Sequence, residues 1–101
     1  MTRELLDPQA IADGLAGLDP GWSADGTKLT RSIEFADFGT AVQFVSLLAP
    51  FAEELDHHPD LRLTWRWVAV ELTTHSAGGV TALDLQLAGL VDEVAAGLPL
   101  A

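Results

Sequence analysis

The segment from Asp37 to Leu55 places the strongest constraint on how this chain can fold. Asp37 is a typical N-cap residue, and it precedes a long run of helix-compatible, mostly apolar residues. The apolar members of this run are Phe38, Ala41, Val42, Phe44, Val45, Leu47, Leu48, Phe51, Ala52 and Leu55. They cover more than one face of a helix, which predicts burial on two sides or a place in the core of an oligomer. Pro50 lacks an amide proton, so we expect it to kink this helix or to split off its last turn.

The N-terminal part of the chain predicts a helix followed by a strand. Asp7-Pro8 is typical of an N-cap and a first helical residue, and Asp19-Pro20-Gly21 should end that helix. Residues 28–35 then predict a strand, preceded by the turn Ala24-Asp25-Gly26 and by a short partner strand near Trp22.

The C-terminal part predicts two more strands and a last helix. Residues 61–74 are rich in strand-forming residues, with Arg66-Trp67 as the expected hairpin turn. Gly78-Gly79 interrupts the chain, and residues 81–98 carry an apolar helical face. The predicted order is therefore α-β-β-α-β-β-α: an α+β domain with a four-stranded antiparallel sheet and helices packed on one face.

Length and composition limit the classes of function. A chain of 101 residues forms a single domain, 1–101, and its hydrophobic content of 49% is more than so small a domain buries alone. We therefore expect a homo-oligomer. The net charge of −10 argues against direct binding of nucleic acid or of an anionic membrane. The lack of cysteines, of an apolar leader and of a membrane-spanning stretch favours the cytoplasm.

All the histidines of the chain, His57, His58 and His75, lie near one another in the sequence and close to carboxylates. Histidine changes its charge nearest neutral pH, so this grouping indicates acid–base chemistry. Pro59 favours extended geometry at His58, so we expect one neighbouring imidazole to face a site and the other to brace it. His75 joins them only if the hairpin folds back over the exit of the long helix. The alternative is that the pair forms an ordinary polar loop and His75 ends a strand.

Adjacent histidines make poor ligand geometry, and the chain has no His-x-x-x-His spacing, so we predict no metal site. Glu53, four residues before His57, could orient an imidazole. Asp84 follows Thr81 with the spacing of a capping box, which by itself explains its presence. Trp65 alone is more typical of a core residue than of a stacking platform.

Taken together, Glu53, His57-His58-Pro59, Trp65, His75 and Asp84 resemble the signature of the pterin-4a-carbinolamine dehydratase family. The flanking segments 33–38 and 72–75 are similar to those of the family as well, and the resemblance extends from about residue 22 to the end. Enzymes of this family remove water from 4a-hydroxytetrahydropterins, which aromatic amino-acid hydroxylases produce. The product is the quinonoid dihydropterin, which can then be reduced again. Some animal relatives also act as dimerisation cofactors of a transcription factor, and a pterin-binding relative with weak activity is a further alternative.

The resemblance implies roles for individual residues. His57, His58 and His75 would be the catalytic residues, with His57 and His75 as the acid–base pair. Glu53 and Asp84 would orient histidines. The substrate-binding residues would be Asp56, Trp65, Thr73, Thr74 and Ser76. The resemblance implies no cofactor, since the pterin is the substrate. It also implies that the chain forms a homodimer or a homotetramer.

Overall fold

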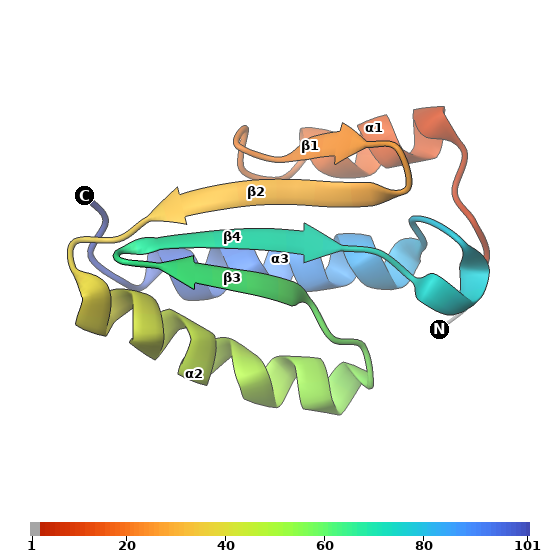
Figure 1. Ribbon diagram of the computed structural model, residues 1–101. Helices are drawn as coiled ribbons and strands as arrows, with labels where there is room; N and C mark the ends of the chain where they lie inside the picture. Colours follow the sequence, from red (N-terminus) through yellow and green to blue (C-terminus); the bar gives the residue numbers. More distant parts are fainter. Residues whose placement is uncertain (1–2) are drawn as a thin grey trace.

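The computed structural model describes residues 3–101 as a sheet with its helices on one side (Figure 1). The helices are α1 (Pro8–Ala16), α2 (Phe38–Leu55) and α3 (Ala82–Ala96), with a short 3-10 helix η1 (His75–Ala77). The strands are β1 (Ser23–Asp25), β2 (Lys28–Glu34), β3 (Asp60–Thr64) and β4 (Trp67–Leu72). This confirms the predicted α+β class and the order of helices and strands.

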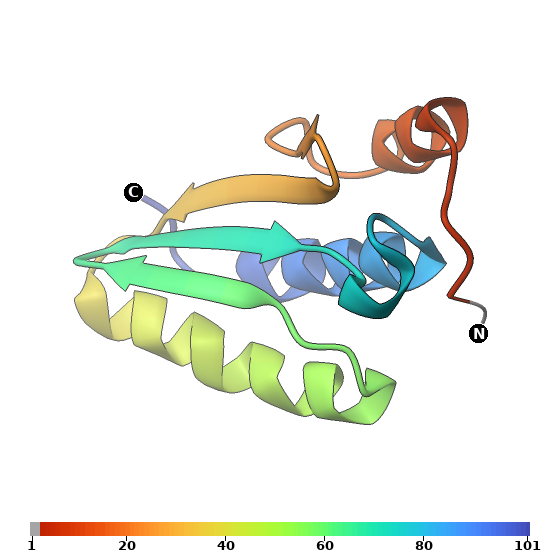
Figure 2. The same cartoon turned by 45° about the vertical axis from the view of Figure 1, so that its right-hand side comes forward.

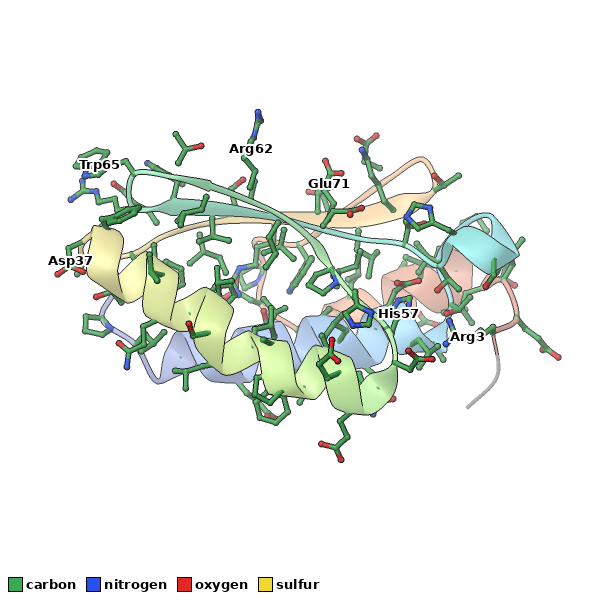
Figure 3. The ribbon with its side chains drawn as sticks, turned by 60° about the horizontal axis from the view of Figure 1, so that its bottom comes forward. Arg3, Asp37, His57, Arg62, Trp65 and Glu71 are labelled. Atoms are coloured by element: carbon green, nitrogen blue, oxygen red, sulfur yellow. The ribbon has the colours of Figure 1, made fainter. Side chains whose placement is uncertain are left out.

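The sheet is antiparallel throughout, in the order β1-β2-β4-β3. The helices α2 and α3 cover one face of it, and α1 packs on α3 beside β1 (Figure 2). Alternate residues of β4, Val68, Val70 and Leu72, enter the core, because successive side chains of a strand point to opposite faces. The other face is open, and Arg62 and Glu71 project from it (Figure 3).

The predicted helix caps are confirmed. The Asp7 carboxylate accepts from the Ala10 backbone N–H at 2.8 Å, and the Asp37 carboxylate accepts from that of Thr40 at 2.7 Å. These bonds satisfy backbone donors that the first turn of a helix cannot pair internally. The hydrogen bonds from Thr40 hold the pKa of Asp37 below its usual value.

Two details of the long helix and the hairpin differ from the sequence predictions. The helix α2 runs from Phe38 to Leu55 through Pro50 without a break, so Pro50 does not split off its last turn. The hairpin turn is Trp65-Arg66 rather than Arg66-Trp67, because Thr64 pairs with Trp67 across β3 and β4. Trp65 adopts a left-handed backbone conformation with φ 55°, which the pattern of strand-forming residues did not signal.

The helix α2 buries one apolar face within the domain and leaves another apolar face exposed, so its predicted burial on two sides does not occur within one chain. Ala41, Phe44, Leu48 and Ala52 are buried against the rest of the domain. Its exposed large apolar residues are Phe38, Val42, Leu47 and Phe51. Within residues 3–101, no helix is long and apolar enough to cross a membrane.

Candidate active site

The site begins where α2 ends. Asp56 takes a left-handed conformation with φ 49°, its backbone N–H bonds to Glu53 O, and the N–H of His57 bonds back to Ala52 O. This is the Schellman arrangement, in which a left-handed residue reverses the chain after a helix. Aspartate tolerates that conformation better than most residues because its short side chain can bond locally. The reversal turns His57 into the domain.

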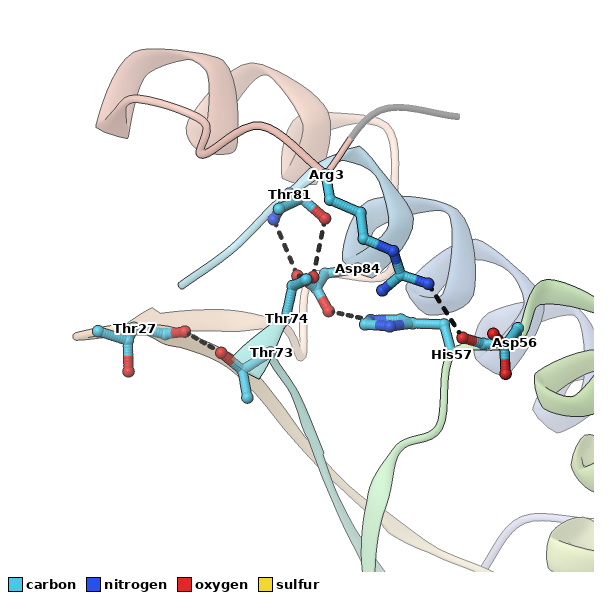
Figure 4. A network of polar contacts seen from close by, with 8 residues as sticks. All are labelled: Arg3, Thr27, Asp56, His57, Thr73, Thr74, Thr81 and Asp84. Carbon is cyan, nitrogen blue, oxygen red and sulfur yellow. Dashed lines mark hydrogen bonds and ion pairs between the residues drawn. The ribbon is translucent and has the colours of Figure 1, made fainter. Parts of the chain in front are cut away.

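His57 lies in a buried pair with Asp84 of α3. The His57 Nε2 and Asp84 Oδ1 atoms are 2.6 Å apart, and the side chains are 6% and 0% exposed. Figure 4 shows this pair at the junction of the α2 exit, the end of β4 and the start of α3. The two residues are far apart in the sequence, so only the packing of α3 against α2 brings them together.

Asp84 accepts several hydrogen bonds at once. Its Oδ2 atom accepts from the Thr81 backbone N–H and from the Thr74 hydroxyl, both at 2.8 Å. The Thr81 hydroxyl lies 2.8 Å from the Thr74 hydroxyl and donates to it, since the Thr74 proton is directed at Asp84. The predicted capping box is therefore confirmed, and the same carboxylate also orients His57.

This arrangement assigns the two nitrogens of the His57 ring. Every group that faces the Asp84 carboxylate is a donor, so His57 Nε2 carries a proton and donates it to Asp84. The nitrogen left to exchange a proton with a ligand is Nδ1. A carboxylate that holds an imidazole in one orientation is a common device of acid–base sites.

His58 has a different partner. Its Nε2 lies 2.7 Å from Glu53 Oε1, and both side chains are largely exposed. Glu53 does contact an imidazole, but the imidazole is that of His58 and not of His57. The alternation of successive side chains in the extended segment before Pro59 separates the two histidines, as we expected.

An open pocket of about 240 Å3 gathers most of the predicted site residues. The predicted residues that line it are Asp56, His57, His58, Thr73, His75 and Ser76. His75 reaches it because β4 runs antiparallel to β3 and ends beside the segment from which β3 begins. The fold-back of the hairpin over the exit of α2 is thus confirmed.

Two predicted substrate-binding residues lie elsewhere. Thr74 is fully buried, and its hydroxyl is occupied by Asp84 and Thr81, so it supports the site from behind. Trp65 is 63% exposed at the hairpin tip, where it stacks against the Arg66 guanidinium. Figure 3 shows it near Asp37, at the end of the molecule away from His57 and Arg3. Trp65 therefore does not line the pocket within one chain.

Arg3, which was not among the predicted site residues, also lines the pocket. Its Nη2 atom donates to the backbone oxygen of Asp56 at 3.2 Å. No local pattern around Arg3 indicates this contact, because it depends on how the N-terminal segment crosses the loop before α3. Among residues 3–101, no group of three or more histidine or acidic side chains is arranged to hold a metal ion.

Comparison with known proteins shows the family to which the chain belongs. A family model described as pterin 4 alpha carbinolamine dehydratase matches residues 4–94. A Streptomyces coelicolor protein is 47% identical over 98 residues, covering 96% of each chain. A Nocardia farcinica protein is 42% identical over 95 residues, covering 94% of this chain and 99% of the relative. Both relatives are named, provisionally, pterin-4-alpha-carbinolamine dehydratases.

A solved structure shares the fold. The Brucella melitensis protein described as a transcriptional coactivator/pterin dehydratase superposes with a TM-score of 0.85 at 39% identity. The match covers 89% of this chain and 97% of that one. The likeness therefore extends over nearly the whole domain.

Proposed function

Because the chain belongs to the pterin-4-alpha-carbinolamine dehydratase family of hydro-lyases, we propose that it dehydrates a 4a-hydroxytetrahydropterin by histidine acid–base catalysis. The observation that carries the proposal is the buried His57–Asp84 pair on a pocket that His58 and His75 also line. A pure binding module has no need to bury a carboxylate in order to orient one imidazole.

The reaction needs an acid and a base and neither gains nor loses electrons. The bond between C4a and the hydroxyl oxygen breaks, and an acid protonates the departing oxygen so that it leaves as water. A base removes the proton from N5, and the electrons of that N–H bond form the double bond between N5 and C4a. Positioned imidazoles are suited to both transfers near neutral pH.

His57 and His75 form the acid–base pair in this proposal. His57 exchanges its proton through Nδ1, since Nε2 is bonded to Asp84. His75 lies across the same pocket at the start of η1. His58, held by Glu53 at the outer side, contacts the leaving hydroxyl or the ring. Asp56, Thr73 and Ser76 line the pocket and contact the pterin in this proposal.

The test is the dehydration of enzymatically generated 4a-hydroxytetrahydropterin, followed by ultraviolet absorbance. We expect the wild type to accelerate the reaction, and His57→Ala and His75→Ala each to lower kcat by about 100-fold, the typical size of a general acid–base contribution. Circular dichroism checks that the variants keep the fold. A folded wild type that gives no acceleration would contradict the proposal.

The physiological role that we propose is the recycling of the pterin cofactor of an aromatic amino-acid hydroxylase. Hydroxylation leaves the cofactor as the carbinolamine, and dehydration makes it available for reduction again. Adding this protein to a hydroxylase with limiting tetrahydropterin and a quinonoid dihydropterin reductase should increase the product formed per pterin. An unchanged yield would argue for another source of the carbinolamine.

We also propose that the chain forms homo-oligomers through the outer face of α2. Phe38, Val42, Leu47 and Phe51 expose large apolar side chains there, which a small acidic monomer has no reason to leave in water. Light scattering of the wild type and of Leu47→Glu/Phe51→Glu tests this proposal. A monomeric wild type would refute it. The same face is the feature that favours the alternative of a protein-interaction cofactor.

A further inference from the structure

The placement of positive charge singles out Arg3. The chain has 5 lysines and arginines against 15 acidic residues. Ion pairs hold Lys28 to Glu71, Arg31 to Asp19 and Asp92, and Arg66 to Glu34. Within the described range 3–101, Arg3 and Arg62 form no ion pair. Arg62 lies on the open face of the sheet, whereas Arg3 lies on the pocket that His57 and His75 line (Figure 3).

The N-terminal segment holds Arg3 in this position. The Leu6 backbone N–H donates to Val80 O at 2.9 Å, just before α3 begins. Leu5 packs over Gly79 so closely that a Cβ there would lie 2.9 Å from Leu5 Cδ2. The Asp7 cap of α1 follows directly. The segment is thus attached to the loop between η1 and α3, and the guanidinium extends from it beside His57 (Figure 4).

The guanidinium offers more donors than its known bond uses. Arginine carries five N–H donors, and the bond to Asp56 O uses one Nη2 donor. That partner is a neutral carbonyl rather than a carboxylate. A guanidinium on a pocket wall is suited to bidentate recognition of a carboxylate or a phosphate.

We propose that Arg3 binds an anionic substituent on the side chain of the pterin, so that the enzyme prefers substrates with a carboxylate or phosphate in the C6 substituent. This inference rests on the proposed function in one respect: the ligand of the pocket is a pterin. The cation compensates locally for the net charge of −10 and for the Asp56 carboxylate on the same pocket. Salt screens the repulsion between a bound anion and the distant acidic residues more than it weakens a direct contact with Arg3.

The test is equilibrium binding of fluorescent pterins that cannot react. The probes are pterin-6-carboxylate, the phosphate monoester of 6-hydroxymethylpterin, and uncharged 6-hydroxymethylpterin. We expect the wild type to bind at least one anionic probe about tenfold more tightly than the uncharged probe, as charge-assisted hydrogen bonds allow. The two anionic probes distinguish carboxylate from phosphate.

Variants assign the preference to its residue. Arg3→Gln should reduce the ratio of the dissociation constants to about one, and Arg3→Lys should keep part of it, because lysine retains the charge without the bidentate geometry. Arg62→Gln is the matched control, since it removes a guanidinium that forms no ion pair and does not line the pocket, and it should leave the ratio unchanged. No anionic preference in the wild type, or a preference that Arg3→Gln retains, would overturn the proposal, as would failure of every probe to bind.

The result of this binding test can be distinguished from the result of the dehydration test of the proposed function. Dehydration of an uncharged 4a-hydroxytetrahydropterin tests catalysis without involving the anionic group. Catalysis without a charge preference in binding overturns only the role of Arg3. A charge preference without catalysis overturns only the dehydratase proposal.

Discussion

Two neighbouring histidines form nearly identical contacts in opposite surroundings. His57 Nε2 lies 2.6 Å from a carboxylate oxygen of Asp84, and His58 Nε2 lies 2.7 Å from one of Glu53. The His57–Asp84 side chains are 6% and 0% exposed, while the His58–Glu53 side chains are 56% and 75% exposed. The distances do not distinguish the pairs, but burial does. An exposed ion pair is screened by water and contributes little, whereas a buried group that loses its partner is left uncompensated.

The largest effect should come from removing the buried carboxylate. Asp84→Ala would leave His57, the Thr74 hydroxyl and the Thr81 backbone N–H without their acceptor. We expect urea denaturation to show a loss of about 3 kcal/mol in the free energy of unfolding, since breaking a buried pair in this way costs about 3–5 kcal/mol.

Asp84→Asn keeps the shape of the side chain and is the better test of catalysis. We expect kcat to fall about 100-fold or more, because the amide no longer secures one orientation of His57.

The matched change at the exposed pair is Glu53→Gln. We expect the free energy of unfolding to change by less than about 1 kcal/mol, and less still at high salt. Equal losses of stability in Glu53→Gln and Asp84→Asn would contradict the distinction by burial.

The next effect concerns the hydroxyl behind the buried pair. Thr74→Val keeps the shape but removes the hydrogen bond to Asp84, so we expect a loss of about 1–2 kcal/mol in the free energy of unfolding. Thr74→Ser should restore most of it. If Thr74 served only stability, its loss would not alter the hydrogen bond of the His57 imidazole. The 15N chemical shifts of that imidazole should therefore be recorded in both variants. We expect Nε2 to remain protonated in both variants, since Asp84 still accepts from it, and its 15N shift to change in Thr74→Val but not in Thr74→Ser, because only the valine variant takes a donor away from the carboxylate. Unchanged shifts in Thr74→Val would show that Asp84 orients His57 without help.

The smallest effect concerns a third carboxylate, the exposed N-cap Asp37. Hydrogen bonds from Thr40 lower the pKa of Asp37 in the folded state, so the charged form stabilises the fold above the unfolded pKa. That contribution is lost as the pH falls through the folded pKa. Urea denaturation of the wild type and of Asp37→Asn should therefore give a difference that is constant near neutral pH and changes only below about pH 4. A difference that changes between pH 6 and 8 would implicate histidines instead of this cap.

Local signals in the sequence determined much of the fold. Asp7, Asp37 and Thr81 mark the starts of α1, α2 and α3, because a capping side chain bonds to backbone donors only a few residues away. The predicted limits of α2 agree with the structure for the same reason. Pro50 did not break the helix, because packing of α2 against α3 and the sheet outweighed the missing hydrogen bond. The hairpin turn was misplaced by one residue because neither Trp65 nor Arg66 carries turn chemistry.

The sequence, through its resemblance to a known family, also grouped most of the residues that line the pocket, namely Asp56, His57, His58, Thr73, His75 and Ser76. Only the tertiary structure decided which carboxylate serves which histidine, that Thr74 supports Asp84, and that Trp65 lies at the far end of the hairpin. It alone brought Arg3 to Asp56 across an interval of 53 residues. The physical reason is the separation in sequence of the groups that interact. Caps and turns depend on hydrogen bonds between residues a few positions apart, whereas burial and distant partners depend on how whole helices and strands pack.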